Sequence, residues 1–283
     1  MNINEDRIKI SESYVDAINK SNLELFDFMK KYKDQVRSVS PLVEFIIERL
    51  CSVVQLAIQG CNWDAEIIYR SALEALIKLT FICSATEAER EIRLKEYWQD
   101  LREVNSIKQS EQAKRNLELY GHDEIMKLMF TPMILDNERE KYLRTKWSKK
   151  QRQALEQKWS FTEMIMFLSK NYFGSSERRF IGLGHEYRYA SHVTHGDETG
   201  VLIIKERQQR TKAEEDIANL AHCTKLLSNS FRFCCAIGNQ ITFLAKQETV
   251  FYSDLNNSMV EIDALGDKYL KMLQEDSVYD KYR

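Results

Sequence analysis

Proline and glycine are scarce in this chain, and their scarcity limits the folds that are open to it. The 283 residues include only two prolines, Pro41 and Pro132, and nine glycines. An average chain of this length would have about 14 prolines and about 20 glycines. Tight turns and β-hairpins depend on these residues, so a β-sandwich, barrel or propeller is excluded as the main architecture. We therefore expect an all-α fold with no significant sheet.

The composition indicates a folded chain and gives no global charge signal. Hydrophobic residues make up 43% and charged residues 30%, which is typical of a folded helical protein. The formal net charge is −2, so any nucleic-acid site has to be local. The six cysteines form no CxxC pair, and the sequence shows neither an apolar leader nor an apolar run of 18 residues. These features favour a cytoplasmic protein with free thiols and no membrane association.

Hydrophobic periodicity predicts a series of helices along the chain. The stretch 63–83 is apolar nearly all round, so we expect it at the centre of the fold. Further helices are expected over residues 4–34, 41–59, 87–119, 138–158, 183–195, 211–247 and 254–274, and a capping box of Ser160 and Glu163 predicts one more over 160–173. We predict one helical bundle domain over residues 1–283, built from roughly eight helices, with a charged helical insertion at 120–160.

Residues 174–200 concentrate the residue types that the rest of the chain lacks. Five of the nine glycines and three of the five histidines lie in this segment. Because long helices need no glycine, we expect the chain to bend sharply on both sides of a short helix over 183–195. If the protein has an active site, this segment is where we expect it.

Two overlapping rows of polar side chains follow this short helix. Tyr187, Ser191 and His195 recur at i, i+4 and i+8, while Arg188, His192 and His195 recur at i, i+4 and i+7. Histidine can transfer protons near neutral pH, and arginine can hold a phosphate and stabilise developing charge. Together they suit cleavage of an RNA phosphodiester by its own 2′-OH, with no metal or other cofactor.

The same side chains also suit a structural polar seam. Arg70 and Glu74 lie four residues apart inside the apolar 63–83 helix, where charges are costly to bury unless they are paired. In the structural interpretation, they hydrogen-bond to the tyrosine, serine and histidines of the other helix and lock the two helices together. In the catalytic interpretation the contact is the same, but Arg70 holds a phosphate and Glu74 tunes a histidine.

Metal binding has weaker support in the sequence. His192 and His195 are followed by carboxylates at 197 and 198, which leaves a metal-dependent helical hydrolase as an alternative. No HExxH motif is present, so we predict no metal ligands. His222 and Cys223 are adjacent in an expected helix and point apart, which makes them a poor chelate.

Residues 141–152 are the most basic segment of the chain. They hold six basic residues and no acidic one, with Tyr142 and Trp147 between them. This pattern predicts contacts with a phosphate backbone and stacking on unpaired bases. A solvated helix face whose aromatic residues dock it to the protein explains the pattern equally well. The predicted nucleic-acid contacts are Lys141, Arg144, Lys146, Lys149, Lys150 and Arg152.

Two motifs resemble those of a bacterial all-helical family of unknown function. Residues 70–74 (RSALE) fit its RSxxE helix, and residues 187–195 (YRYASHVTH) fit its YxxxSxxxH helix. The resemblance covers about residues 40–250. It implies a single helical domain, often encoded near mobile or defence loci, and brings no established activity.

A second resemblance is to the HEPN class of ribonucleases, which are helical and usually dimeric. These enzymes carry an arginine followed, after four to six residues, by a histidine. Arg188 and His195 have six residues between them and fit the pattern, although Tyr189 stands where a polar residue is usual. The resemblance implies that Arg188 and His195 are the catalytic pair and that Glu74 is their acidic partner.

Our first hypothesis is a HEPN-like, metal-independent endoribonuclease that acts as a homodimer on RNA, as a toxin or anti-phage defence effector. His195 would be the general acid and base, Arg188 and Arg70 would hold the phosphate, and Tyr187 and Ser191 would orient it. The full set of candidate catalytic residues is Arg188, His195, His192, Tyr187, Ser191, Arg70 and Glu74. The alternative is a non-enzymatic scaffold or sensor, in which this cluster is a structural core and the basic segment binds a nucleic acid or a partner protein from a neighbouring gene.

Overall fold

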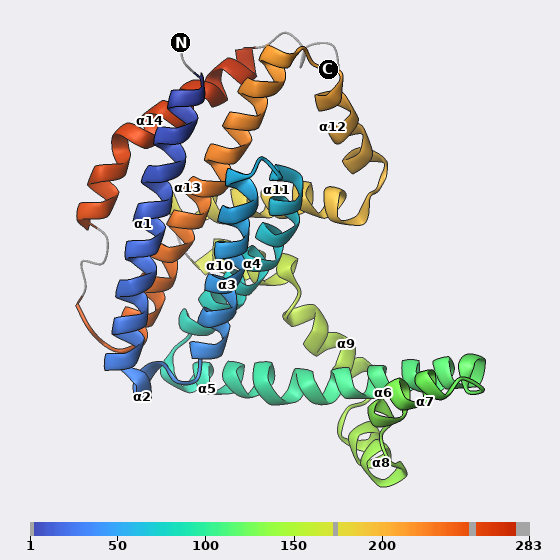
Figure 1. Cartoon of the computed structure of the whole chain (residues 1–283). Helices are drawn as coiled ribbons and strands as arrows, with labels where there is room; N and C mark the ends of the chain where they lie inside the picture. Colours follow the sequence, from blue (N-terminus) through green and yellow to red (C-terminus); the bar gives the residue numbers. More distant parts are fainter. Residues whose placement is uncertain (1–2, 172–174, 249–252, 276–283) are drawn as a thin grey trace. The chain divides into compact units, whose positions relative to one another are not determined.

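The computed structural model describes residues 3–171, 175–248 and 253–275, and every regular element in these ranges is helical (Figure 1). The prediction of an all-α fold is confirmed. The chain divides into two compact units, Met1–Cys83 with Leu168–Arg283 and Ser84–Phe167, which we call the first and the second unit. The charged insertion expected at 120–160 lies within the second unit. Within the described ranges, we find no helix with both the length and the hydrophobicity that a membrane crossing requires.

The first unit is built around two long helices, α4 and α13. Its helices are α1 (Ile3–Lys31), α2 (Lys33–Val36), α3 (Ser40–Ile58), α4 (Asn62–Cys83), α11 (Ser175–His195), α12 (Glu198–Gln208), α13 (Lys212–Leu244) and α14 (Ser253–Glu275). Helix α13 packs against α1, α3, α4 and α14, and α4 also packs against α3 and α11. The elements that carry the candidate site therefore meet at α4.

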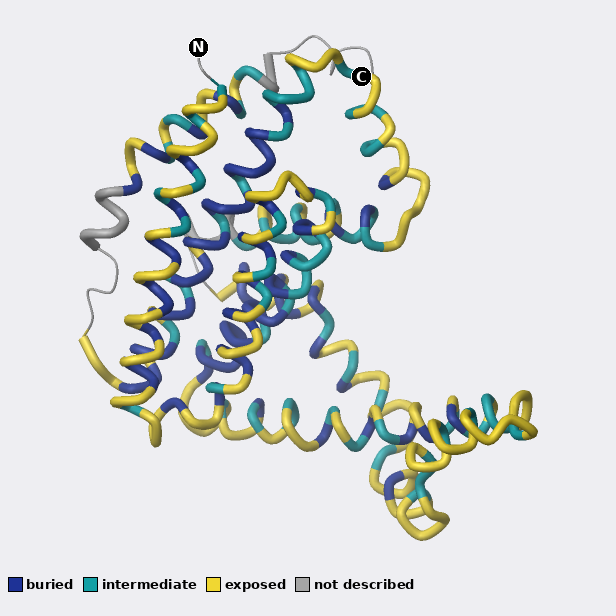
Figure 2. The backbone as a smooth tube through the Cα atoms, viewed as in Figure 1, coloured by how far each residue is buried: buried dark blue, intermediate teal, exposed yellow. Residues whose placement is uncertain are grey.

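Helix α4 is as central as its composition predicts. Buried residues follow one another around it, among them Tyr69, Leu73, Leu76 and Ile77, and it appears largely dark in Figure 2. Burying one such aliphatic side chain contributes about 1.5–3 kcal/mol to folding. Because α4 is covered on most sides, its polar side chains have to find partners on neighbouring helices.

The second unit contains more helical segments than the sequence suggested. They are α5 (Glu87–Lys95), the π-helical turn η1 (Glu96–Asp100), α6 (Leu101–Tyr120), α7 (Glu124–Phe130), the 3₁₀ turn η2 (Thr131–Met133), α8 (Asn137–Lys146), α9 (Lys149–Lys158) and most of α10 (Phe161–Asn171). The helix expected over 87–119 is interrupted by η1. The helix expected over 138–158 is a pair, because Ser148 forms a capping box that starts α9. The estimate of roughly eight helices was therefore too low.

The glycines before the polar rows do not bend the chain, contrary to our expectation. Helix α11 runs from Ser175 to His195, so Gly182 and Gly184 lie within it; Gly174 lies outside the described residues. A helical glycine costs about 1 kcal/mol relative to alanine, a cost that the packing of α11 against α4 can outweigh. The expected helix over 183–195 was thus too short at its N-terminal end.

The bend expected after the polar rows is present. Gly196 has a φ of +57°, a left-handed conformation that favours glycine, and it ends α11. Asp197 then starts α12 by accepting a hydrogen bond of 3.1 Å from the Gly200 backbone N–H. A Cβ atom on Gly200 would lie 2.3 Å from the backbone oxygen of His192. Only glycine allows this close approach of α12 to α11.

We predict opposite effects for alanine at two of these glycines. Gly200→Ala should lower the free energy of unfolding by about 1–3 kcal/mol, because the new methyl group overlaps the His192 carbonyl. Gly182→Ala is the matched control, since a Cβ there meets nothing within 4 Å; it should raise stability by about 0.5–1 kcal/mol. Urea unfolding measures both. A neutral Gly200→Ala variant would contradict the packing described.

Candidate functional site

A polar network joins α4 to α11 through Tyr187. The Arg70 Nη2 donates a hydrogen bond of 2.7 Å to the Tyr187 hydroxyl, and its guanidinium lies 4.5 Å from the centre of the tyrosine ring. The hydroxyl in turn donates to Glu74 at 3.4 Å, and Lys78 forms an ion pair of 2.8 Å with the other Glu74 oxygen. The predicted contact of Arg70 and Glu74 with this helix is confirmed.

The environment of Tyr187 keeps its phenol protonated. Burial raises the pKa of Tyr187, and the negative charge of Glu74 raises it further, whereas Arg70 lowers it by a smaller amount. The hydroxyl therefore stays a hydrogen-bond donor at neutral pH. Its chemistry suits holding two helices together better than transferring a proton.

A second bridge lies beside the first. The hydroxyl of Tyr69, which is fully buried, donates a hydrogen bond of 2.8 Å to Glu186 on α11. Asn229 on α13 donates to the same carboxylate oxygen at 3.2 Å. Glu186 thus ties three helices together, a role that no sequence pattern indicated.

The most deeply buried charge among the described residues of the first unit is one that no sequence motif indicated. Glu66 on α4 has no exposed surface, and its two carboxylate oxygens meet two side chains of α13. The His222 Nε2 lies 3.0 Å from one oxygen and the Lys225 Nζ lies 3.1 Å from the other. Burial alone would raise the pKa of Glu66, but these two partners lower it overall. The carboxylate is therefore ionised and paired.

The hydrogen bonds of His222 fix its protonation. Arg207 on α12 lies 2.9 Å from Nδ1 and can only donate, so Nδ1 is an acceptor and the proton sits on Nε2, facing Glu66. Burial lowers the pKa of His222, and the charges of Arg207 and Lys225 lower it further, against the opposing effect of Glu66. Trp63 covers the ring edge-on at a centroid distance of 4.9 Å. His222 is thus neutral and enclosed.

Arg188 and His195 differ from all of these residues. Both side chains are exposed on α11, and neither forms a hydrogen bond or ion pair with another residue in the part of the chain that the structure describes. Arg188 and His195 are seven residues apart, and seven residues of α-helix make nearly two whole turns. The two side chains therefore point the same way and lie about 10 Å apart along the helix axis. The contact of Glu74 with this pair, which the resemblance to HEPN ribonucleases implied, is not formed: the partners of Glu74 are Tyr187 and Lys78.

The other two candidates on α11 are Ser191 and His192, which are less exposed than Arg188 and His195. Ser191 is half-buried, and the His192 Nδ1 lies 2.7 Å from the carboxylate of Asp197, which starts α12. A hydrogen bond from the Gly200 backbone and the contact with His192 lower the pKa of Asp197. His192 therefore supports the corner between the two helices. Among the described residues, no group of three or more His, Cys, Asp or Glu side chains is placed to hold a metal ion.

Half of the predicted nucleic-acid contacts are neutralised by acidic side chains of α6 and α8. Arg144 pairs with Glu140 and Glu111, at 2.8 Å and 2.9 Å, and Lys146 pairs with Glu103 at 2.7 Å. Arg152 lies 4.0 Å from Glu111. The Trp147 indole also donates to Glu103, at 2.7 Å, so this aromatic residue docks the segment to α6. Lys141, Lys149 and Lys150 are exposed and have no ion-pair partner among the described residues.

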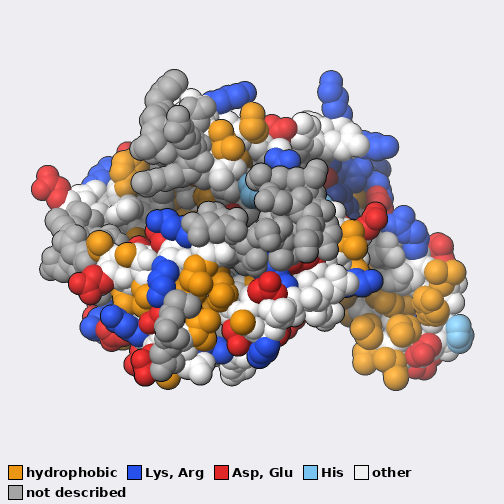
Figure 3. Space-filling model, turned by 90° about the horizontal axis from the view of Figure 1, so that it is seen from above, with side chains coloured by type: hydrophobic (Ala, Val, Ile, Leu, Met, Phe, Trp, Pro, Cys, Tyr) orange, Lys and Arg blue, Asp and Glu red, His pale blue; other side chains and the backbone are white. Residues whose placement is uncertain are grey.

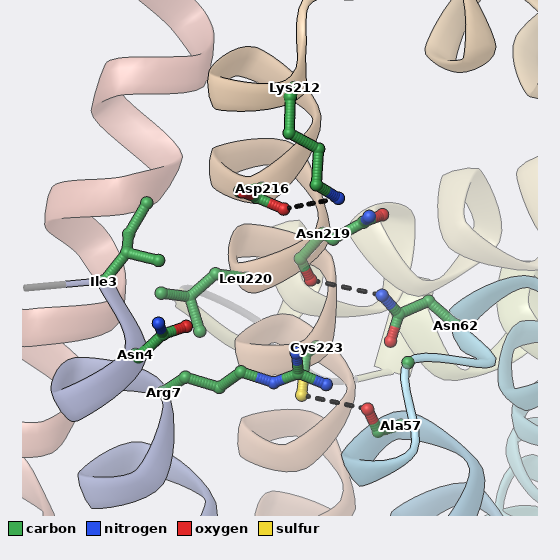
Figure 4. Close-up of a pocket in the computed structure, with 11 residues that line it drawn as sticks. Ile3, Asn4, Arg7, Ala57, Asn62, Lys212, Asp216, Asn219, Leu220 and Cys223 are labelled. Atoms are coloured by element: carbon green, nitrogen blue, oxygen red, sulfur yellow. Dashed lines mark hydrogen bonds and ion pairs between the residues drawn. The ribbon is translucent and has the colours of Figure 1, made fainter.

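A cavity of about 130 Å³ in the first unit lies away from the candidate residues (Figure 4). It is lined by the first turn of α1, the end of α3 and the start of α13. Arg7 donates to the Ile58 carbonyl at 3.1 Å, and the Cys223 thiol donates to the Ala57 carbonyl at 3.3 Å. These contacts satisfy the carbonyls at the end of α3, so these two groups of the cavity serve the fold.

The fold and the network define an all-helical protein in which a buried central helix is tied to its neighbours by polar side chains. The model of a family of unknown function (DUF5677) matches residues 36–208, more than half of the chain, so the chain belongs to this family. Both motifs that suggested a helical family of unknown function lie inside the match, and that prediction is confirmed. No curated protein and no solved structure matches the chain.

The pKa of His222 predicts how stability depends on pH. Its pKa is lowered in the folded state from an ordinary value of 6.5, so below about pH 6.5 the unfolded chain binds more protons than the folded one. The free energy of unfolding should therefore fall as the pH is lowered from 7.5 to 5.5. The lowered pKa values of the carboxyl groups, Glu66 included, affect stability only below this range.

His222→Gln should reduce this pH dependence, and His185→Gln is the control, because His185 is exposed on α11. Urea unfolding at several pH values gives the slope of the free energy of unfolding against pH. In the wild-type protein, the ¹⁵N shifts of the His222 ring should also report the Nε2–H form. An unchanged slope in His222→Gln, or a ring protonated at pH 7, would show that the pairing is incorrect.

Proposed function

We propose that this protein is a metal-independent endoribonuclease in which Arg188 and His195 are the reacting pair. The observation that carries the proposal is that both side chains are exposed on one face of α11 and are engaged by no other described residue. A phosphate between them lies within reach of both, because an arginine side chain spans much of one helical turn. The adjacent Tyr187 is held by Arg70, which fixes the helix that presents the pair.

The proposed reaction uses the 2′-OH of the substrate as the nucleophile. His195 takes the proton from the 2′-OH as the 2′-oxygen bonds to phosphorus. The bond between phosphorus and the 5′-oxygen breaks, and His195 returns the proton to that oxygen. Arg188 stabilises the negative charge that grows on the phosphoryl oxygens. The products are a 2′,3′-cyclic phosphate and a 5′-hydroxyl.

The remaining candidates take supporting roles in this proposal. Arg70, Glu74 and Tyr187 are positioning residues, since their polar groups already bind one another. His192 orders the end of α11 through Asp197, and Ser191 lies between the two helical turns that carry the reacting pair. Arg70 therefore positions Tyr187 in this proposal, in place of the phosphate-holding role first expected of it.

RNA as substrate and a role as a toxin or anti-phage defence effector are part of the same proposal. They rest on the resemblance to HEPN ribonucleases and on the chemistry of the exposed pair. The exposed Lys141, Lys149 and Lys150 of the second unit supply unpaired positive charge for a phosphate backbone. The ion-paired Arg144 and Lys146 contribute less, because their charges are already compensated.

We predict that the purified protein cleaves RNA and that either alanine variant abolishes the cleavage. Labelled single-stranded RNA and bulk tRNA serve as substrates, and a DNA oligonucleotide of the same sequence should stay intact because it lacks the 2′-OH. His195→Ala and Arg188→Ala should each lower the rate at least about 100-fold. EDTA should not lower it, and new 5′-hydroxyl ends should accept a label from polynucleotide kinase.

His185→Ala is the matched control, because it removes an exposed histidine of the same helix that is not in the proposed pair. It should cleave at the wild-type rate, and all variants should keep the wild-type unfolding midpoint. Full activity in His195→Ala, or inhibition of the wild-type protein by EDTA, would contradict the proposal.

A non-enzymatic scaffold is the second candidate function, and the Arg70–Tyr187–Glu74 network favours it. Tyr187→Phe removes the hydroxyl that joins α4 and α11, and should cost about 0.5–1.5 kcal/mol of stability in either case, because its half-buried partners lose a hydrogen bond. The scaffold predicts that this structural loss is the only effect. Under the nuclease proposal, Tyr187→Phe also slows RNA cleavage while His195→Ala leaves stability unchanged.

A further inference from the structure

The cavity of Figure 4 contains a buried polar side chain that the fold satisfies only in part. Asn62, the first residue of α4, lines the cavity and is 3% exposed. Its Nδ2 donates a hydrogen bond of 3.1 Å to the Asn219 carbonyl on α13, but its Oδ1 has no hydrogen-bond partner among the described residues. A buried acceptor without a partner is costly to a fold, so this oxygen points to a bound molecule that donates to it.

The same cavity is lined by a cation that no acidic side chain neutralises. Arg7 reaches from α1 toward the end of α3, where its Nη2 donates to the Ile58 carbonyl. Its other N–H groups have no partner in the part of the chain that the structure describes, and it forms no ion pair there. A guanidinium with free N–H groups beside a cavity favours a carboxylate, which it can bind with two parallel hydrogen bonds.

The acceptor groups of the cavity lie on the same wall of α13, further toward the start of the helix. Asp216, Asn219 and Cys223 follow one another at i, i+3 and i+7 and all line the cavity. Figure 4 shows the Arg7 guanidinium beside Cys223, so Asn219 lies about one helical turn, ~6 Å, further along. The Asn219 side-chain amide makes no hydrogen bond with a described residue. A molecule that carries a donor and a carboxylate on neighbouring atoms can bridge this distance.

The size of the cavity limits the molecule to a small one. The volume is about 130 Å³, and its lining includes the buried Ala57, Leu220 and Cys223. A cavity of ~150 Å³ holds benzene, so a ligand of about six non-hydrogen atoms fits. On the face that Figure 3 shows, acidic and basic side chains are interspersed, and the net charge of the chain is −2. No broad positive field therefore directs a polyanion to this cavity.

We propose that this cavity is a binding site for a small α-amino acid of the size of glycine or alanine. The carboxylate of the ligand binds Arg7, and its ammonium group donates to the Asn62 Oδ1 and to the side-chain oxygen of Asn219. Asp216, which pairs with Lys212 at 3.0 Å, adds a negative charge that favours an ammonium group over a hydroxyl. The inference does not rest on the nuclease proposal, because the cavity lies away from the proposed reacting pair.

Isothermal titration calorimetry of the full chain with glycine and with L-alanine tests the site. At least one of them should bind with a dissociation constant below about 1 mM, and the unfolding midpoint should rise with its concentration. The NMR signals of the Asn62 and Asn219 side-chain NH₂ groups should shift saturably with the same constant. L-Leucine should bind at least about tenfold more weakly, because it exceeds the cavity volume. No binding of either amino acid at about 10 mM would overturn the proposal.

Arg7→Gln should weaken the binding at least about tenfold, because it removes the partner of the carboxylate. Lys9→Gln is the matched control, since it removes an exposed cation of the same helix that does not line the cavity; its affinity should be that of the wild-type protein. An unchanged affinity in Arg7→Gln, or an equal loss in both variants, would show that the site is misplaced. The NMR shifts of the wild-type protein give the location without any variant.

Three further probes test the chemical class of the ligand. Acetate and glycolate carry the carboxylate but no ammonium group, and each should bind at least about tenfold more weakly than L-alanine. Inorganic phosphate should bind more weakly as well, because it offers the acceptors of the cavity no ammonium group. Binding of glycolate or phosphate as tight as that of L-alanine would overturn the assignment to an α-amino acid.

Discussion

The buried carboxylate of Glu66 is the constraint on which the packing of the first unit depends. A lone ionised carboxyl in the interior costs several kcal/mol, so α4 can occupy the centre only where a compensating charge reaches it. Lys225 supplies that charge, and His222 fills the second oxygen while accepting a hydrogen bond from Arg207. One carboxylate therefore fixes the register of α4, α12 and α13. A packed hydrophobic core without such a group tolerates more than one arrangement of its helices.

The polar contacts between α4 and α11 answer the same requirement, which is that a polar group on a buried helix needs a partner on a neighbouring one. Residues of α11 that face α4, such as Tyr187 and Glu186, are bound by partners on α4 and α13. Arg188 follows Tyr187 directly, and a step of 100° turns it out of the contact and into solvent. One helix thus combines a bound polar face with an exposed face that carries the proposed reacting pair. The bound face sets where the exposed residues lie, which is what a site needs in order to hold a substrate in place.

The sequence predicted the class of fold well, together with one contact of the candidate site. Scarce proline and glycine with helical periodicity were enough for the all-α fold, and the position of Arg70 and Glu74 inside an apolar helix was enough to predict their contact with α11. The role of Glu66 was missed because its partner His222 lies 156 residues away, and a single sequence does not reveal such pairings. Gly182 was misjudged because local glycine preference competes with tertiary packing, and packing decided the helix. The end at Gly196, where φ is positive, was predicted correctly.

The pairing of Glu66 also bears on what the family match represents. The matched range 36–208 includes Glu66 and Arg207 but neither His222 nor Lys225, both of which lie on α13. A chain limited to the matched range would leave the buried Glu66, near the start of α4, without its compensating cation. It would also uncover the apolar sides of α3 and α4 that pack on α13. The matched range is therefore not a complete folding unit, and the residues after 208 are as necessary to the central helix as those within the match.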